Sequence, residues 1–227
     1  AWMGSECSSQ SETGGTLMKE KCTAIVLAAG SGKRMGTQVR KQYLDIWGKP
    51  VLYYSLKCFE DSRVIDEVIL VTGAGEIEYC RDEIVKKYNF TKVCRIVTGG
   101  DERYDSVYAG LKNCEDCDYV FIHDGARPFV DEEIIEEALL TVRQCGACVA
   151  AVPSKDTVKI VEKDGVIAQT PQRSKVWIVQ TPQVFAYPLI RSAYDKMMNL
   201  PHDHVTDDAM AVEWMERHSV KVTKGSY

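Results

Sequence analysis

The chain has 227 residues, a length that fits one large domain or two small ones. Its hydrophobic content of 45% and charged content of 27% are ordinary for a globular protein. The formal net charge of -5 argues against a nucleic-acid binder, which needs a basic face, but allows a local basic cleft for a small phosphate ligand. No apolar run approaches the length of a membrane span. We therefore expect neither a nucleic acid nor a membrane as a partner.

The N-terminal stretch and the cysteines indicate the cellular compartment of the protein. Residues 1–20 are polar and lack the apolar core of a signal peptide, so we interpret them as a disordered extension left by cloning, and residues 21–227 as a single domain. Nine cysteines without an export signal predict reduced thiols in a cytoplasmic protein. Two Cys-x-x-Cys pairs, Cys114/Cys117 and Cys145/Cys148, leave structural zinc as a less favoured alternative, because they lie further apart than in zinc ribbons.

Apolar runs that predict strands alternate along the chain with amphipathic segments that predict helices. The expected strands cover residues 23–27, 67–72, 93–97, 119–122, 147–152, 176–179 and 220–222. The expected helices cover residues 51–60, 76–88, 103–113, 132–144, 188–198 and 207–217. Asp131 and Thr206 are the expected N-caps of the fourth and sixth helices. This alternation predicts a Rossmann-like α/β fold, with a mostly parallel sheet and helices on both faces.

The region 154–175 interrupts that alternation. Residues 157–161 and 166–170 alternate between apolar and polar side chains and flank the turn Lys163-Asp164-Gly165, which predicts a protruding β-hairpin. A lone hairpin is marginally stable in water. We therefore expect it to pack on its own domain or to act as a dimerisation arm that reaches a partner subunit.

A loop rich in small residues follows the first expected strand at residues 28–36 (AAGSGKRMG). Its bare backbone N–H groups, together with Arg34 and Lys41, predict an anion site suited to a polyphosphate. The loop is not a P-loop, because Leu27 and Arg34 replace the first glycine and the Ser/Thr. It is not the dinucleotide fingerprint either, because Met35 replaces the third glycine. A solvated turn with incidental charge is the alternative.

A carboxylate follows another expected strand at the same edge of the sheet. Ligands of such sheets bind outside the carboxyl ends of the strands, and Asp124 lies just beyond residues 119–122. Mg²⁺ typically takes one or two carboxylates together with substrate phosphates, so Asp124 is the expected metal ligand. A simple helix or turn cap is the alternative for Asp124. We interpret the neighbouring His123 as a structural residue.

Seven short motifs occur in order along the chain, at residues 28–35, 41–43, 99–107, 123–128, 156–159, 180–183 and 206–209. Together they resemble those of the 2-C-methyl-D-erythritol 4-phosphate cytidylyltransferase family, a nucleotidyltransferase of the non-mevalonate isoprenoid pathway. The resemblance spans residues 22 to about 225. It implies that CMP passes from CTP to methylerythritol phosphate by in-line attack at the α-phosphorus, and that pyrophosphate leaves.

The resemblance also implies roles for individual residues. Arg34 and Lys41 would hold the CTP phosphates and stabilise the pentacoordinate α-phosphorus, while Asp124 would bind Mg²⁺. The implied nucleotide-binding residues are Ala28, Ala29, Gly30, Gly32, Gly100, Asp101, Ser106 and Gly125. The implied substrate-binding residues are Arg127, Thr157 and Arg173, brought to the sugar phosphate by the arm region of a partner subunit in a homodimer, and also Thr181 and Thr206. In the family, a lysine that follows the position of Tyr227 also lies at the active site.

Two alternative functions stay open at this point. Ribitol-5-phosphate cytidylyltransferase has the same fold and nucleotide, although Arg173 and the segments 180–183 and 206–207 favour methylerythritol phosphate as the acceptor. A non-catalytic nucleotide-binding protein would be expected to lack Arg34, Lys41 or Asp124, and all three are present.

Overall fold

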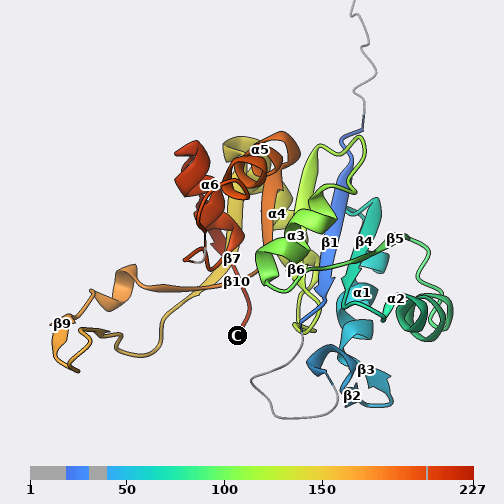
Figure 1. The fold of residues 1–227 in the computed structure, drawn as a ribbon, viewed down its shortest axis with the longest axis horizontal. Coiled ribbons are helices and arrows are strands. Elements are labelled where there is room, and N and C mark those ends of the chain that lie inside the picture. The colour runs from blue at the N-terminus through green and yellow to red at the C-terminus, as the bar shows by residue number, and fades with distance from the viewer. Residues whose placement is uncertain (1–18, 31–39, 203) are drawn as a thin grey trace, which may run out of the picture.

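The computed structural model describes residues 19–30, 40–202 and 204–227, and its centre is a seven-stranded sheet (Figure 1). The strand order is β11-β7-β10-β6-β1-β4-β5. Only β10 runs antiparallel to its neighbours in this sheet. The strands are β1 (Cys22–Ala28), β4 (Glu67–Thr72), β5 (Val93–Thr98), β6 (Tyr119–Asp124), β7 (Ala147–Pro153), β10 (Trp177–Ala186) and β11 (Lys221–Lys224). The predicted Rossmann-like, mainly parallel sheet is confirmed.

The helices lie close to the predicted ranges. They are α1 (Val51–Asp61), α2 (Ile77–Tyr79) with a π-helical continuation over Cys80–Lys86, α3 (Arg103–Leu111), α4 (Glu132–Cys145), α5 (Tyr187–Met197) and α6 (Asp208–Glu216). The body also contains a 3₁₀ turn, η1 (Lys41–Tyr43), and a small hairpin of β2 (Asp45–Ile46) and β3 (Lys49–Pro50), and a second 3₁₀ turn, η3 (Arg173–Lys175), lies at the end of the arm region. None of the described helices is long and apolar enough to cross a membrane.

One predicted helix cap is confirmed and the other is wrong. The Asp131 carboxylate accepts a hydrogen bond from the Ile134 N–H at 2.9 Å and so caps α4. The N-cap of α6 is Asp207 rather than Thr206, because the Asp207 side chain accepts from the Met210 N–H at 2.9 Å. Both residue types cap helices well, and the sequence pattern does not tell which of two neighbours has the extended backbone of a cap.

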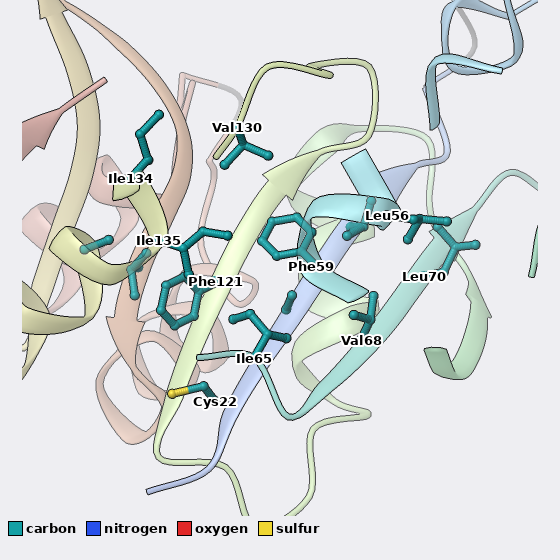
Figure 2. Close-up of a cluster of buried hydrophobic side chains, with 14 of the residues drawn as sticks. Cys22, Leu56, Phe59, Ile65, Val68, Leu70, Phe121, Val130, Ile134 and Ile135 are labelled. Carbon is teal, nitrogen blue, oxygen red and sulfur yellow. The ribbon is translucent and has the colours of Figure 1, made fainter. Parts of the chain in front are cut away.

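Helices cover both faces of the sheet because successive strand side chains point to opposite sides. On one face, Val26, Leu70 and Phe121 pack against α1 and α4, and Figure 2 shows part of this cluster around Phe59 and Phe121. On the other face, Ile25 packs in a second cluster with side chains of α3, α5 and α6. Strands β1, β4, β6 and β7 are therefore buried on both sides, as their nearly continuous apolar sequences predict, whereas the edge strands β5 and β11 keep exposed side chains.

The predicted hairpin is present and extends away from the sheet (Figure 1). Its paired strands, β8 (Ile160–Val161) and β9 (Ile167–Gln169), are shorter than expected. Four large apolar side chains of the hairpin are exposed, namely Ile160, Val161, Val166 and Ile167. Within one chain the hairpin therefore does not pack on the body, which leaves contact with another molecule as the remaining expectation.

Candidate active site

The site lies where β1 and β6 end side by side. The chain runs outward from β1 to β4 and β5 and then returns to the other side of β1 as β6, so the order of strands reverses between β1 and β6. Ligands of open α/β sheets bind at such a reversal, outside the carboxyl ends of the strands. Leu27 pairs with Asp124 across this point, and the Gly125 N–H donates to the Leu27 carbonyl at 2.8 Å. The start of the predicted loop, at residues 28–30, and the predicted carboxylate are thus neighbours.

Backbone lines the edge between β1 and β5. A Cβ on Gly99 would collide with Ser106 and Ala29, and a Cβ on Gly125 would lie 2.9 Å from the Leu27 carbonyl oxygen. Ser106 is buried in the first turn of α3. Ala29 and Ser106, predicted nucleotide-binding residues, therefore meet at Gly99, beside Gly100, and their close packing leaves no room for a side chain at position 99. Gly32, another predicted nucleotide-binding residue, and Arg34, a predicted phosphate-binding cation, lie outside the described residues.

Lys41 is held next to the end of β1 by the residue that follows it. Gln42 is buried, and its amide donates to the Ala28 carbonyl at 2.5 Å and to the Gly30 carbonyl at 3.2 Å. Lys41 itself is exposed. The structure therefore brings this predicted phosphate-binding cation to the start of the predicted loop, at residues 28–30.

Asp124 is clamped between two arginines. Arg103 Nε donates to one of its carboxylate oxygens at 3.3 Å, and Arg127 Nε donates to the other at 3.1 Å. Burial opposes ionisation of this carboxyl, but the Arg103 guanidinium, assisted by Arg127, holds the pKa of Asp124 below its usual value. Because the side chain keeps 31% of its surface exposed, Asp124 is an ionised carboxylate that remains accessible.

Sequence reasoning missed the role of Arg103, which links Asp124 to a buried carboxylate. The guanidinium makes a fork of two 2.8 Å hydrogen bonds to Asp208, which is fully buried at the start of α6. Asp208 also accepts from the Tyr194 hydroxyl at 2.6 Å. Two arginines and two aspartates thus balance in charge. Arg103 and Asp208 lie in the motifs at residues 99–107 and 206–209, but their pairing joins positions too far apart in sequence for spacing to reveal it.

His123 has all its hydrogen bonds satisfied inside the protein. The Asp124 N–H donates to the Thr181 hydroxyl at 3.3 Å, and that hydroxyl lies 2.9 Å from His123 Nδ1. His123 Nε2 lies 3.0 Å from the Arg127 carbonyl, which can only accept, so we assign the proton to Nε2. Burial lowers the pKa of His123 to about 4. These contacts support a structural role for a neutral His123, and they show that the Thr181 hydroxyl already has two partners.

The remaining predicted substrate residues lie in three places. Arg127 belongs to the connection between β6 and α4 of the same chain, so its assignment to the arm region of a partner is wrong. Thr157 and Arg173 do lie in the arm and are exposed, and neither side chain makes a hydrogen bond or ion pair with the described residues. Thr206 is exposed beside the first turn of α6, which Gln183 Oε1 anchors by accepting from the Asp208 and Ala209 N–H groups.

Comparison with known proteins agrees with this geometry. The family model described as 2-C-methyl-D-erythritol 4-phosphate cytidylyltransferase matches residues 22–227. Relatives with that name from Lachnoclostridium phytofermentans and Lachnospira eligens are 50% and 49% identical over 92% and 90% of this chain and 89% and 90% of theirs. The crystal structure of 4-diphosphocytidyl-2C-methyl-D-erythritol synthase from Anaerococcus prevotii is similar, with a TM-score of 0.82 and 35% identity over 92% of this chain and 88% of that one. The chain belongs to the 2-C-methyl-D-erythritol 4-phosphate cytidylyltransferase family.

Proposed function

We propose that the chain transfers CMP from CTP to 2-C-methyl-D-erythritol 4-phosphate, giving 4-diphosphocytidyl-2-C-methyl-D-erythritol and pyrophosphate. The observation that carries this proposal is the convergence of Lys41, the Ala28–Gly30 backbone and the ionised Asp124 at the point where β1 and β6 end. A nucleoside triphosphate binds through cations and backbone N–H groups at its phosphates and through a carboxylate that holds its metal ion, and this edge of the sheet offers all three. Family membership supplies the cytidylyl group and the acceptor.

The proposed chemistry needs little beyond positioning and charge. The acceptor's phosphate oxygen is already ionised, so it attacks the α-phosphorus without a general base, and pyrophosphate leaves on the opposite side. Negative charge then grows on the phosphoryl oxygens, and the Lys41 ammonium and nearby backbone N–H groups stabilise it. Arg34, which lies outside the described residues, is proposed to act with Lys41 on the same charge.

We propose Mg²⁺ as the assisting metal ion, with Asp124 as its protein ligand. One accessible, ionised carboxylate fits Mg²⁺, which keeps several waters and relies on substrate phosphates for its other ligands. No group of three or more His, Cys, Asp or Glu suited to a metal occurs among the described residues. When bound, the ion neutralises the phosphates. Asp124 would hold the ion at the end of β6, and Arg103 and Arg127 keep Asp124 ionised.

The exposed arm supports the proposal that the active unit is a homodimer. Four large apolar side chains of the hairpin face solvent, and Arg173, in the turn just after it, has no partner among the described residues. A guanidinium suits bidentate binding of the acceptor's phosphate. We propose that Thr157 and Arg173 complete the site of a second copy. The eight described cysteines are unpaired, which supports a cytoplasmic location.

Pyrophosphate release is the direct test. The enzyme is incubated with CTP and Mg²⁺, and methylerythritol phosphate and ribitol 5-phosphate are offered in parallel. We expect release with the first acceptor, and rejection of UTP by a large factor, since unpaired hydrogen-bonding groups in a base pocket discriminate by up to about 10⁴-fold. Release with ribitol 5-phosphate alone would assign the sister activity, and release with neither would remove the catalytic proposal.

A further inference from the structure

A single carboxylate oxygen gathers the residues on either side of Lys41. Glu76 Oε2 accepts from Arg40 Nη1 at 2.9 Å and from the Tyr43 hydroxyl at 3.1 Å. The same oxygen accepts from the Gly73 N–H at 3.1 Å, just beyond the end of β4. The Glu76 side chain keeps only 19% of its surface exposed, so solvent does not readily replace these bonds. The segment that carries Lys41 is thereby tied to the next strand of the sheet.

The local helix geometry explains why Arg40 and Tyr43 reach the same oxygen. Lys41–Tyr43 forms a 3₁₀ turn, and in a 3₁₀ turn the side chains at positions i and i+3 lie on one face. Gly73 leaves room for this arrangement, because a Cβ there would collide with the Arg40 guanidinium. Tyr43 also lies 3.1 Å from Cys80 Sγ and packs edge-on against Tyr79 at 5.2 Å between ring centroids. The Arg40 and Tyr43 side chains therefore pack against residues 73–80.

The Gln42 side chain binds a different strand, β1. Its amide holds the Ala28 and Gly30 carbonyls at the end of β1, so the short segment is fastened to β1 through Gln42 and to the end of β4 through Glu76. Of the four residues 40–43, only Lys41 has a side chain without a hydrogen bond or ion pair to any described residue. Its ammonium is the cation that this double attachment leaves available for a ligand.

We propose that Glu76 is a positioning residue that sets the Lys41 ammonium at the phosphates of the bound nucleotide. This inference rests on the proposed function, because it assigns to Lys41 a nucleoside triphosphate. Glu76 touches neither substrate nor reacting atoms and acts only through the placement of residues 40–43. Misplacement of a catalytic group by about 1 Å costs up to about 10²-fold in rate. We therefore expect the loss of Glu76 to lower mainly kcat.

The first experiment compares two glutamates of the same region. Glu76→Ala removes the shared acceptor, and Glu76→Gln keeps the shape without the charge, in case the alanine variant folds poorly. Glu78→Ala is the matched control, because Glu78 is exposed and, among the described residues, pairs only with Arg81 on the helix surface. We expect kcat to fall about 30-fold in Glu76→Ala and about 5-fold in Glu76→Gln, with the KM for CTP within about 3-fold of wild type. Glu78→Ala should match wild type.

A double-mutant cycle separates positioning from general stability. In a Lys41→Ala background the added Glu76→Ala change should lower kcat less than about 3-fold, because the ammonium that Glu76 positions is already gone. A purely structural Glu76 would cost the same factor in both backgrounds. Tyr43→Phe, which keeps the ring and removes one donor to Glu76, should give a reduction of about 3-fold. Equal losses with and without Lys41, or a Glu76→Ala enzyme with wild-type kcat, would overturn the inference.

A second readout does not depend on turnover. Acylation of Lys41 by an N-hydroxysuccinimide ester, followed by peptide mass spectrometry, measures how well CTP with Mg²⁺ covers the ammonium. We expect CTP to slow the reaction at least about 10-fold in wild type and less than about 3-fold in Glu76→Ala at saturating nucleotide. Equal protection in both proteins would overturn the inference. An enzyme that shows this difference but releases no pyrophosphate would instead contradict the proposed function, so the two failures are distinguishable.

Discussion

The carboxyl edge of the sheet and the arm differ in how far their side chains find partners within the same chain. At the edge, Asp124, Arg103 and Asp208 exchange hydrogen bonds within one chain, and the buried His123 is fully partnered. In the arm, the large apolar side chains of β8 and β9 face solvent and only a few backbone bonds hold the strands together. The edge is complete as a structure by itself, whereas the arm exposes apolar surface that usually marks a contact with another molecule.

This contrast separates residues that determine where the chemistry occurs from residues that a second copy would supply. Substitutions at the edge should change turnover or stability within each chain. Substitutions in the arm should leave the stability of the body intact and act through the assembly. Five sets of variants test this division, beginning with the largest expected effect.

Asp124→Asn should lower kcat about 10³-fold, because the amide keeps the shape but is a poor ligand for a hard cation. The fold should survive, since Arg103 keeps its fork to Asp208 and Arg127 is half exposed. Pyrophosphate release across a Mg²⁺ titration, beside a thermal melt, measures both effects. A Mg²⁺ dependence identical to that of wild type would make Asp124 a structural cap.

Arg173→Ala should lower kcat/KM for the acceptor about 10²-fold with no change in melting temperature, because the side chain is exposed and without a partner among the described residues of its chain. Lys175→Ala, in the same 3₁₀ turn, is the matched control and should stay near wild type. Steady-state kinetics with varied acceptor concentration give the comparison. A lower melting temperature in Arg173→Ala would place this residue among the structural contacts of its own chain.

Mixing two inactive variants tests whether the arm acts across the dimer. Lys41→Ala and Arg173→Ala would damage different halves of each site, so a mixed dimer would have one doubly damaged site and one intact site. Refolding the two variants together makes about half of the dimers mixed, and activity should recover to roughly a quarter of wild type. An inactive mixture that native mass spectrometry shows to contain the heterodimer would place Arg173 in the site of its own subunit or in none.

A combined Ile160→Ser and Ile167→Ser change should weaken the dimer at least about 10-fold, because both side chains are about half exposed in the single chain and available for burial. The melting temperature of the body should stay the same. Sedimentation at several concentrations gives the dissociation constant. If wild type and variant sediment identically, the arm is not the dimer contact.

Tyr194→Phe should have the smallest effect on turnover, within about 3-fold, while lowering the free energy of unfolding by about 2 kcal/mol. The lost hydroxyl donates to the buried Asp208, and hydrogen bonds to charged groups contribute about 1.5–3 kcal/mol. Tyr108→Phe is the control, because the Tyr108 hydroxyl donates to the more exposed Asp195. Denaturant unfolding and kinetics give both quantities. A loss of turnover above about 10-fold would show that Asp208 sets the position of Asp124 through Arg103.

Sequence by itself determined the elements and most of the site. Buried strands such as residues 67–72 are continuous apolar runs, and parallel strands place their carboxyl ends at one edge. The pattern of residues alone therefore predicts that the loop at 28–30 and Asp124 lie together. The hairpin followed from a period-two pattern around a turn. These features depend on near neighbours in the chain, whose preferences a short window contains.

The tertiary structure alone decided which side chains are partners. Arg103 and Asp208 are 105 positions apart, and Arg40 and Glu76 are 36 apart, yet each pair is joined by hydrogen bonds of 2.8 to 2.9 Å. The start of α6 is also decided by a distant residue. Gln183 of β10 binds the N–H groups of its first turn, so Asp207 caps the helix and not the predicted Thr206. Such partners arise because the sheet order places the ends of distant strands and helices side by side, and no local pattern of residues records that juxtaposition.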